Sequence, residues 1–159
     1  NDGTNLDVAN NFPTNQYSFE SNPNSMFLTI GASTRIAKKE LAADFSNYSQ
    51  TKVDIFAPGH EIWNTVPQSE YMKLQGTSMA APMVSGVAAM LKSYFPTLTM
   101  SEIKAIMLTT GKSYKGTMEI QPGTEDTLVD FATMSVTGSV INVENAVKAC
   151  KELEKSKMN

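Results

Sequence analysis

Apolar runs separated by polar, turn-rich stretches predict short buried strands along the first half of the chain. Residues 26–33 form a continuous apolar run with polar neighbours on both sides. This pattern is typical of a strand that is buried on both faces of a sheet. Residues 53–56 predict a second short strand, which ends at Ala57-Pro58-Gly59 because proline and glycine interrupt regular structure.

Two further short strands are predicted at residues 62–66 and 71–74. Gln68-Ser69-Glu70 lies between them and has the composition of a turn. The two strands can therefore pair as a hairpin.

Three helices are predicted after this hairpin. The first runs from Ser78 to about Phe95, and Pro82 is expected in its first turn, where a missing N–H is harmless. The second begins with a capping box formed by Thr99 and Glu102 and stops at Gly111. The third begins near Val143. Its apolar side consists of Ala146, Val147, Cys150 and Leu153.

The polar stretches divide the chain into a surface loop, a core and a tail. Residues 1–25 are rich in Asn, Ser, Thr and Pro and predict a surface loop. Residues 26–150 contain the predicted core, in which residues 112–137 are turn-rich with a short hairpin. The charged residues 151–159 are expected to fray. We see neither an internal repeat nor a linker, so the chain reads as one segment of a single domain.

Composition and charge narrow the class of protein. The chain has 159 residues, 41% of them hydrophobic, which suits a globular domain with a substantial core and argues against disorder. A net charge of −3 without a basic block gives no support for a nucleic-acid partner. No apolar run approaches the length that spans a membrane. The single Cys150 excludes a disulfide within the chain and is expected in the core.

The segment Gly76-Thr77-Ser78-Met79-Ala80-Ala81-Pro82 carries the clearest chemical signal. It places a serine where a loop turns into a helix. Unpaired backbone N–H groups and the positive end of the helix dipole lie at such a position. They can stabilise a negative oxygen beside a serine nucleophile, as acyl transfer requires. Serine is also favoured as a helix N-cap, so Gly-Thr-Ser alone leaves a purely structural interpretation open.

The whole segment matches the nucleophile motif of the subtilisin-like serine proteases (subtilases, peptidase family S8). Other segments resemble the same family in the expected order from the first residue to about Ala149. They are Asn1-Asp2-Gly3, residues 27–32, Asp44-Phe45-Ser46-Asn47-Tyr48, residues 53–59 and Val140-Ile141-Asn142-Val143. The resemblance implies an α/β three-layer sandwich with a mostly parallel sheet, of which this chain supplies the C-terminal portion.

The resemblance also implies roles for four residues. Ser78 would be the nucleophile, and Asn1 would donate to the oxyanion. Thr77 would hold the oxyanion loop, and Gly76 would let the substrate backbone approach closely. The catalytic Asp and His of the family lie upstream of the oxyanion asparagine, so both are expected on sequence outside this chain. The chain alone is therefore expected to be inactive.

Several alternatives stand beside this interpretation. His60, the only histidine of the chain, could be the base, although the position after Ala-Pro-Gly is not catalytic in the family. Asn1 before Asp-Gly could be a turn residue only. A lipase is disfavoured because Ser78 lacks the Gly-x-Ser-x-Gly elbow. The parent could also be a non-catalytic binding or scaffold protein derived from a subtilase.

No metal ion or cofactor is assigned from the sequence. Asp2, Asp7 and Asp44 lack the spacing of a calcium loop. The family fold can hold structural calcium, but no residue here can be assigned to it. Met83 stands where many relatives carry a histidine, at a structural position, and Met79 beside the nucleophile is an oxidation target.

The resemblance further implies the partners and the location. The expected partners are a peptide or protein substrate, the missing N-terminal half of the domain and a propeptide. The expected location is extracytoplasmic, although this chain contains no targeting segment.

Overall fold

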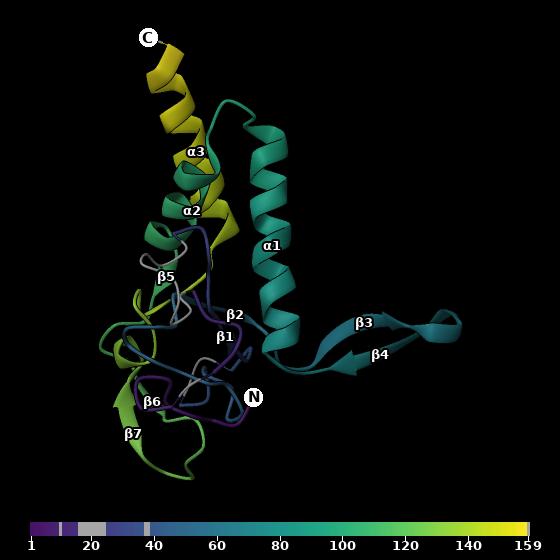
Figure 1. Cartoon of the computed structure of the whole chain (residues 1–159), viewed down its shortest axis with the longest axis vertical. Coiled ribbons are helices and arrows are strands. Elements are labelled where there is room, and N and C mark those ends of the chain that lie inside the picture. The colour runs from purple at the N-terminus through teal and green to yellow at the C-terminus, as the bar shows by residue number, and fades with distance from the viewer. Residues whose placement is uncertain (10, 16–24, 37–38, 159) are drawn as a thin grey trace.

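A four-stranded sheet lies at the centre of the chain (Figure 1). The computed structural model describes residues 1–9, 11–15, 25–36 and 39–158. The strand order is β1 (Ile30–Ser33), β2 (Ile55–Pro58), β8 (Ser139–Val140) and β5 (Lys112–Ser113). The first three are parallel, and β5 is antiparallel to β8. β1 is an edge strand, because β2 is its only strand partner among the described residues.

The predicted strand 26–33 is shorter in the structure, because side chains bind the backbone of its first half. Lys104 Nζ donates to the carbonyl of Phe27 at 2.9 Å and also to that of Ser25. The N–H of Thr29 donates to the Asp54 carboxylate at 2.7 Å. These groups are therefore satisfied without a neighbouring strand, and regular pairing begins only at Ile30.

The second strand is displaced by two residues from its predicted position. The prediction of residues 53–56 is wrong at both ends, since β2 covers Ile55–Pro58. The carbonyls of Val53 and Asp54 accept hydrogen bonds from the N–H groups of Val136 and Thr137. These two residues therefore connect to the loop before β8, and Asp54 also donates its N–H to the carbonyl of Thr29 just before β1, at 2.9 Å.

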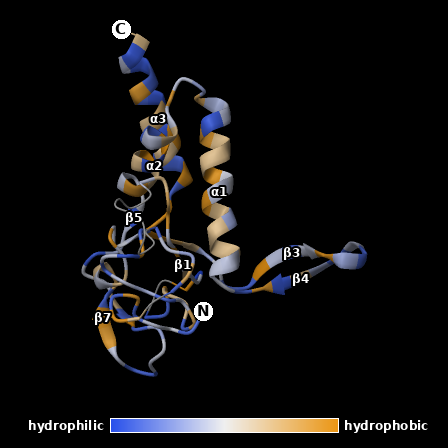
Figure 2. Cartoon of the chain, viewed as in Figure 1, coloured by the Kyte–Doolittle hydropathy of each residue, from blue (hydrophilic) through white to orange (hydrophobic). Residues whose placement is uncertain are grey.

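Three helices form a layer on one side of the sheet, which they contact mainly through α1. α1 (Thr77–Tyr94) packs on β1 and β2, and α2 (Met100–Thr109) and α3 (Val143–Met158) pack beside it (Figures 1 and 2). All three contribute to one apolar core, which also takes Ala32 and Ala57 from the sheet. Cys150 is fully buried in this core, as predicted.

α1 begins one residue earlier than the sequence predicted. Its first residue is Thr77, so Pro82 lies in the second turn and not in the first. A proline there cannot donate to the carbonyl of Ser78, which therefore lacks its intrahelical partner. The prediction that Pro82 is harmless in the first turn is thus wrong.

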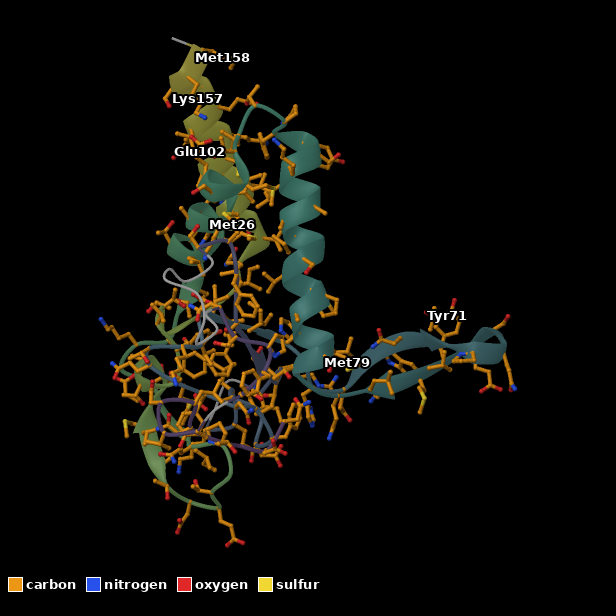
Figure 3. All side chains as sticks on the ribbon, viewed as in Figure 1. Met26, Tyr71, Met79, Glu102, Lys157 and Met158 are labelled. Carbon is orange, nitrogen blue, oxygen red and sulfur yellow. The ribbon has the colours of Figure 1, made fainter. Side chains whose placement is uncertain are left out.

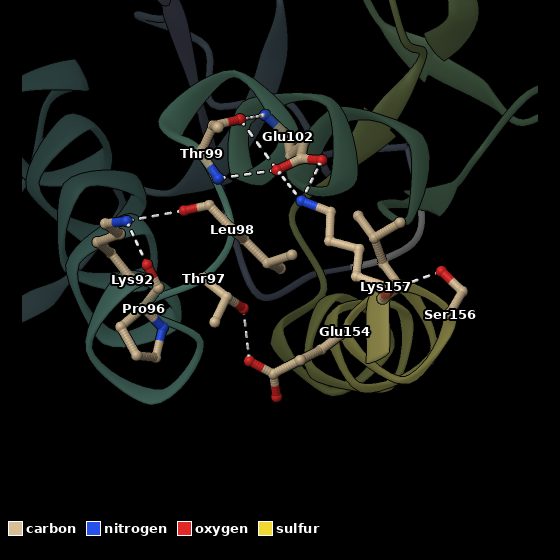
Figure 4. Close-up of polar contacts among 10 residues, drawn as sticks. Lys92, Pro96, Thr97, Leu98, Thr99, Glu102, Glu154, Ser156 and Lys157 are labelled. Carbon is tan, nitrogen blue, oxygen red and sulfur yellow. Dashed lines mark hydrogen bonds and ion pairs between the residues drawn. The ribbon is translucent and has the colours of Figure 1, made fainter. Parts of the chain in front are cut away.

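The capping box of α2 is formed as predicted and is linked to α3 (Figure 4). Thr99 Oγ1 accepts from the N–H of Glu102 at 3.2 Å, and Glu102 Oε2 accepts from the N–H of Thr99 at 2.8 Å. Lys157 lies 2.7 Å from Glu102 Oε1, and Glu154 accepts from Thr97 at 2.7 Å. The predicted fraying of the tail is therefore wrong: α3 continues to Met158, because its last turns are held against α2.

The second face of the sheet is covered, among the described residues, by loops and a hairpin. The hairpin consists of β6 (Met118–Ile120) and β7 (Leu128–Asp130), followed by the 3-10 turn η2 (Phe131–Thr133). Phe131 lies in a second apolar core with its ring centroid 5.0 Å from that of Phe56. The hairpin predicted within residues 112–137 is thus confirmed.

A further hairpin extends away from the rest of the molecule (Figure 1). It is formed by β3 (Ile62–Val66) and β4 (Glu70–Leu74), joined by the 3-10 turn η1 (Pro67–Ser69). This pairing agrees with the sequence prediction. The α/β class is also confirmed, with helices against a mostly parallel sheet. Part of the predicted N-terminal loop, residues 16–24, lies outside the described residues, and the division into loop, core and tail stays a prediction.

Candidate active site

Two glycines let the loop between β4 and α1 lie against the sheet. The N–H of Gly76 donates to the carbonyl of Gly59 at 2.8 Å. A Cβ at Gly59 would lie 2.8 Å from Ala32 Cβ and 2.8 Å from the Gly76 carbonyl oxygen, so a side chain would force the loop away. Gly76 has φ +145°, a conformation that L side chains rarely adopt. These two glycines therefore place the residues that follow.

Asn1 and Thr77 come together although 76 positions separate them. The Oδ1 atom of Asn1 accepts from the N–H of Thr77 at 2.8 Å and from its Oγ1 at 2.9 Å. Both bonds use the oxygen of the carboxamide. The Nδ2 group of Asn1 has no hydrogen bond to any described residue, so it is available as a donor.

Asn47 holds the backbone that carries Asn1. Its Oδ1 atom accepts from the N–H groups of Asp2 and Thr4, both at 3.1 Å. The N–H of Gly3 between them donates to the carbonyl of Phe45 at 3.0 Å. The segment after Asn1 is thus fastened to the loop at 45–47, which limits the positions that the Asn1 side chain can take.

Ser78 is the second residue of α1, and its side chain is exposed. Its backbone N–H points out of the first helical turn, where no intrahelical acceptor exists. Neither this N–H nor Oγ forms a hydrogen bond with another described residue. The N-cap interpretation of Ser78 is wrong, because the N-cap is Gly76 and no side chain caps the helix.

A cleft of about 260 Å³ contains Asn1, Thr77 and Ser78. Its apolar wall comes mainly from Phe27, Leu28 and Ile30, which lead into β1. One cavity is therefore lined by the residues that carry three polar groups. These groups are the free Nδ2 of Asn1, the free N–H of Ser78 and the hydroxyl of Ser78. Two donors beside a hydroxyl can bind an oxygen that becomes negative when the hydroxyl attacks a carbonyl.

His60 belongs to a different cleft. Its ring stacks on Phe45 with 6.3 Å between the ring centroids, and it lines a cavity of about 330 Å³ with Glu40 and Asp44. It forms no hydrogen bond with Ser78, and it does not line the cleft that contains Ser78. The arrangement therefore gives the catalytic interpretation of His60 no support.

Other side chains complete the description of the site. Met83 is exposed on α1, and Met79 lies where the β3–β4 hairpin joins this helix (Figure 3).

Burial raises the pKa of the Cys150 thiol, which argues against a reactive role. Within the described ranges, no three His, Cys, Asp or Glu side chains gather as they would around a metal ion. The described helices also include none that could cross a membrane.

Sequence reasoning missed two residues that position the site, Asn47 and Gly59. A lone asparagine in a polar loop carries no signal for the N–H groups that it will meet more than forty positions away. The sequence predicts Gly59 only as part of the stop of a strand. Its close approach to Ala32 and Gly76 depends on tertiary packing, which a local pattern does not contain.

Comparison with known proteins assigns the family. The profile described as "Subtilase family" matches residues 3–134 of the chain. The chain belongs to the subtilase family. This subtilase segment is 39% identical over 103 residues to the extracellular basic protease of Dichelobacter nodosus, an alignment that covers 58% of the chain and 16% of that protein. It is 52% identical over 52 residues to the major intracellular serine protease of Bacillus subtilis (strain 168), covering 33% of the chain and 16% of that protein.

Solved structures show the same fold. One structure, described under the assembly of the subtilase cytotoxin SubAB, has a TM-score of 0.72 at 22% identity, and the match covers 99% of this subtilase segment and 48% of that chain. The prenylagaramide maturation protease PagA has a TM-score of 0.55 at 28% identity, covering 76% and 41%. The segment thus spans less than half of these two structures and about a sixth of the two curated relatives.

Proposed function

We propose that this chain is the C-terminal part of a subtilisin-type serine endopeptidase, with Ser78 as nucleophile and Asn1 as oxyanion donor. One observation carries the proposal. Thr77 binds the oxygen of the Asn1 carboxamide, which leaves Nδ2 free in the cleft that also contains Ser78. Family membership and the names of the two relatives above, an extracellular basic protease and an intracellular serine protease, support the same reaction.

The proposed reaction runs through an acyl-enzyme. Ser78 Oγ attacks the carbonyl carbon of the scissile peptide bond, and its proton passes to a histidine outside this chain. The carbonyl oxygen becomes negative and accepts hydrogen bonds from Asn1 Nδ2 and the Ser78 N–H. The histidine returns the proton to the leaving amine, and water then hydrolyses the ester on Ser78. Thr77 acts as a positioning residue, because it holds Asn1. The proposed steps need no cofactor.

The base and its orienting carboxylate must come from an upstream segment. His60 stacks on Phe45 in another cleft, and the two solved structures described above are each more than twice as long as the matched part of this chain. We use the term complete domain for this chain together with that proposed segment.

The partners of the complete domain would be a polypeptide substrate and a propeptide. A location outside the cytoplasm agrees with the Dichelobacter relative, whereas the Bacillus relative is named as intracellular.

Labelling of the complete domain with a fluorophosphonate tests the proposal. The wild type is expected to take one label per chain and to hydrolyse chromogenic peptides. Ser78→Ala is expected to lose the label and to slow hydrolysis by roughly 10⁴–10⁶-fold. Because Ser78 Oγ has no partner among the described residues, the free energy of unfolding should change by less than about 0.5 kcal/mol.

Ser85→Ala is the matched control, because Ser85 lies on the same helix, is exposed and donates only to the carbonyl of Ala81. It should keep both label and activity. Unchanged hydrolysis in Ser78→Ala would refute the nucleophile assignment. A wild type that takes no label and cleaves no peptide would favour the non-catalytic scaffold instead.

A further inference from the structure

The β3–β4 hairpin carries two large aromatic side chains in solvent. Trp63 is 65% exposed and Tyr71 is 71% exposed. Figure 3 shows Tyr71 on the outer part of the hairpin, well away from the helices and the sheet. Single exposed apolar side chains are normal on a protein surface, whereas neighbouring ones that form a patch mark an interaction site.

The pairing register places these aromatic residues on one face. Trp63 lies opposite Lys73, and Thr65 lies opposite Tyr71, so the four side chains point to the same side of the hairpin. We call these four residues the aromatic face. Along β3 the burial alternates: Ile62, Asn64 and Val66 are partly buried, whereas Trp63 and Thr65 are exposed. On β3 the aromatic face is therefore the more exposed one, whereas on β4 both faces are exposed.

Charged neighbours hold Trp63 in place. The Lys73 ammonium lies 5.9 Å from the centroid of the Trp63 ring, a cation–π arrangement. Lys73 also lies 3.5 Å from Glu61, and Arg35 lies 2.7 Å from the other oxygen of the same carboxylate. This chain of contacts ties the base of the hairpin to the loop after β1. An aromatic side chain held in this way loses less conformational entropy when it binds a partner.

The hairpin is continuous with the loop that carries the nucleophile. Only Gln75, Gly76 and Thr77 separate β4 from Ser78. Among the described residues β3 and β4 pair only with each other, so both outer edges present unpaired N–H and C=O groups. Extended polypeptides add to such edges and fit side chains against the adjoining face. A substrate chain that leaves the cleft can therefore continue along the hairpin.

We propose that the aromatic face binds an extended, unfolded stretch of the protein substrate, outside the residues that flank the bond to be cut. This inference rests on the proposed function, because it assigns the polypeptide substrate of the same site to a second surface. β4 alone spans about 17 Å at the usual rise per strand residue, so a short peptide held in the cleft does not reach Tyr71. The face should thus favour long unfolded substrates over short ones.

Kinetics of the complete domain on two substrates test this inference. The double variant Trp63→Ala/Tyr71→Ala is compared with wild type on reduced, carboxymethylated casein and on a tetrapeptide p-nitroanilide. We expect kcat/KM on the casein to fall by about five- to thirty-fold, the range expected for the loss of one or two aromatic anchors. We expect kcat/KM on the anilide to stay within about two-fold of wild type, since this substrate is too short to extend from the cleft to Tyr71.

Three controls keep the test decisive. Met72→Ala removes a large, 48% exposed side chain from the opposite face of the same hairpin and should leave kcat/KM on both substrates within about two-fold of wild type. Trp63→Phe/Tyr71→Phe keeps the rings and should retain most of the activity on casein. Light scattering should give the same mass for wild type and double variant, whereas a lower mass for the variant would assign the face to a second copy of this chain and overturn the inference.

Two further results would contradict the inference. Equal losses on casein and anilide, with a lower melting temperature, would mean that another part of the protein covers this face. An unchanged ratio of the two activities would mean that the substrate does not touch it. Loss of anilide hydrolysis in Ser78→Ala establishes the proposed function separately, so failure of the aromatic face leaves the nucleophile assignment intact.

Discussion

At the scale of single residues, hydrogen bonds decide which polar atoms stay free for chemistry. Asn1 gives its oxygen to Thr77 and keeps its N–H₂ group, while the first turn of α1 leaves the N–H of Ser78 without an acceptor. A carboxamide rotated by 180° would present its oxygen to the substrate and repel an oxyanion. Thr77 opposes that rotation, because its backbone N–H can only donate and therefore needs the oxygen of Asn1.

Substitution of Asn1 tests this arrangement in the complete domain. Asn1→Ala should lower kcat by about 10²–10³-fold and leave KM nearly unchanged, as expected for the loss of one oxyanion donor. Asn1→Asp keeps an acceptor for Thr77 but removes the donor, so it should be at least as damaging. Steady-state kinetics on a chromogenic peptide measure both. A raised KM with unchanged kcat would make Asn1 a binding or turn residue only.

Prediction at this scale succeeded where a motif carries the chemistry. Ser78 lies in a seven-residue motif. The hydrogen bonds between Asn1 and Thr77 agree with the resemblance to subtilases, which implies that both residues belong to the oxyanion site. The anchor that holds Asn1, the carboxamide of Asn47, could not be predicted because its partners are backbone groups distant in sequence. Their meeting depends on the path of the loops and not on any local preference.

At the scale of elements, the end of α3 depends on the start of α2. Glu102 completes the capping box of α2 and at the same time accepts from Lys157 at 2.8 Å. The bonds from Lys157 and Thr99 lower the pKa of Glu102 from 4.5 to about 2. The folded state therefore favours the ionised carboxylate, and one side chain stabilises two helices.

The pH dependence of stability follows from this lowered pKa. Stabilisation by Glu102 is fully present above its ordinary pKa of 4.5 and is lost as the pH falls towards about 2. The complete domain should therefore be more stable than its Glu102→Gln variant at pH 6, and the difference should shrink between pH 4.5 and 2. Urea unfolding midpoints over this range measure it.

Glu144→Gln is the control for this experiment. Glu144 is also paired, with Lys148 at 2.6 Å, but both residues belong to α3, so this pair connects no second helix. Its removal should have a smaller effect at pH 6. A difference between wild type and Glu102→Gln that does not vary with pH would show that the charge of Glu102 contributes nothing.

Elements with local signals were predicted well, and elements that depend on distant side chains were not. Residues close together in the sequence predict the turn between β3 and β4 and the capping box of α2. Both features are confirmed. The first half of the run at 26–33 is as apolar as the second half. It is not a strand because Lys104 and Asp54 bind its backbone, and no apolar pattern contains that information.

At the scale of the whole molecule, one edge of the sheet and much of α1 are only partly covered by the described residues. β2 pairs with one edge of β1, whereas the other edge is bound by the loop at 41–46 through Ala32 and Thr34 and has no strand partner. α1 buries only three of its 18 residues, Ala80, Val84 and Leu91. A mostly apolar groove of about 350 Å³ lies between α1, α2 and the segment before β1. A strand edge without a strand partner beside an apolar groove favours association with another polypeptide.

We expect the isolated 159-residue chain to associate with itself or to unfold without cooperativity, and to have no protease activity. The association follows from the β1 edge that lacks a strand partner and from the apolar groove beside it, and the inactivity follows from the lack of a base for Ser78. Light scattering, thermal denaturation and hydrolysis of casein measure these three properties. A monodisperse monomer with a sharp melt would show that the segment is self-contained. Turnover that disappears in Ser78→Ala would show that it is also self-sufficient.

The burial of Cys150 has a practical consequence for such experiments. It is the only thiol of the chain, and its sulfur lies in the core shared by the three helices. A thiol reagent must wait until α3 separates from that core, because only an exposed thiolate reacts. The alkylation rate therefore reports how often the helical layer opens, and it does so without an engineered cysteine.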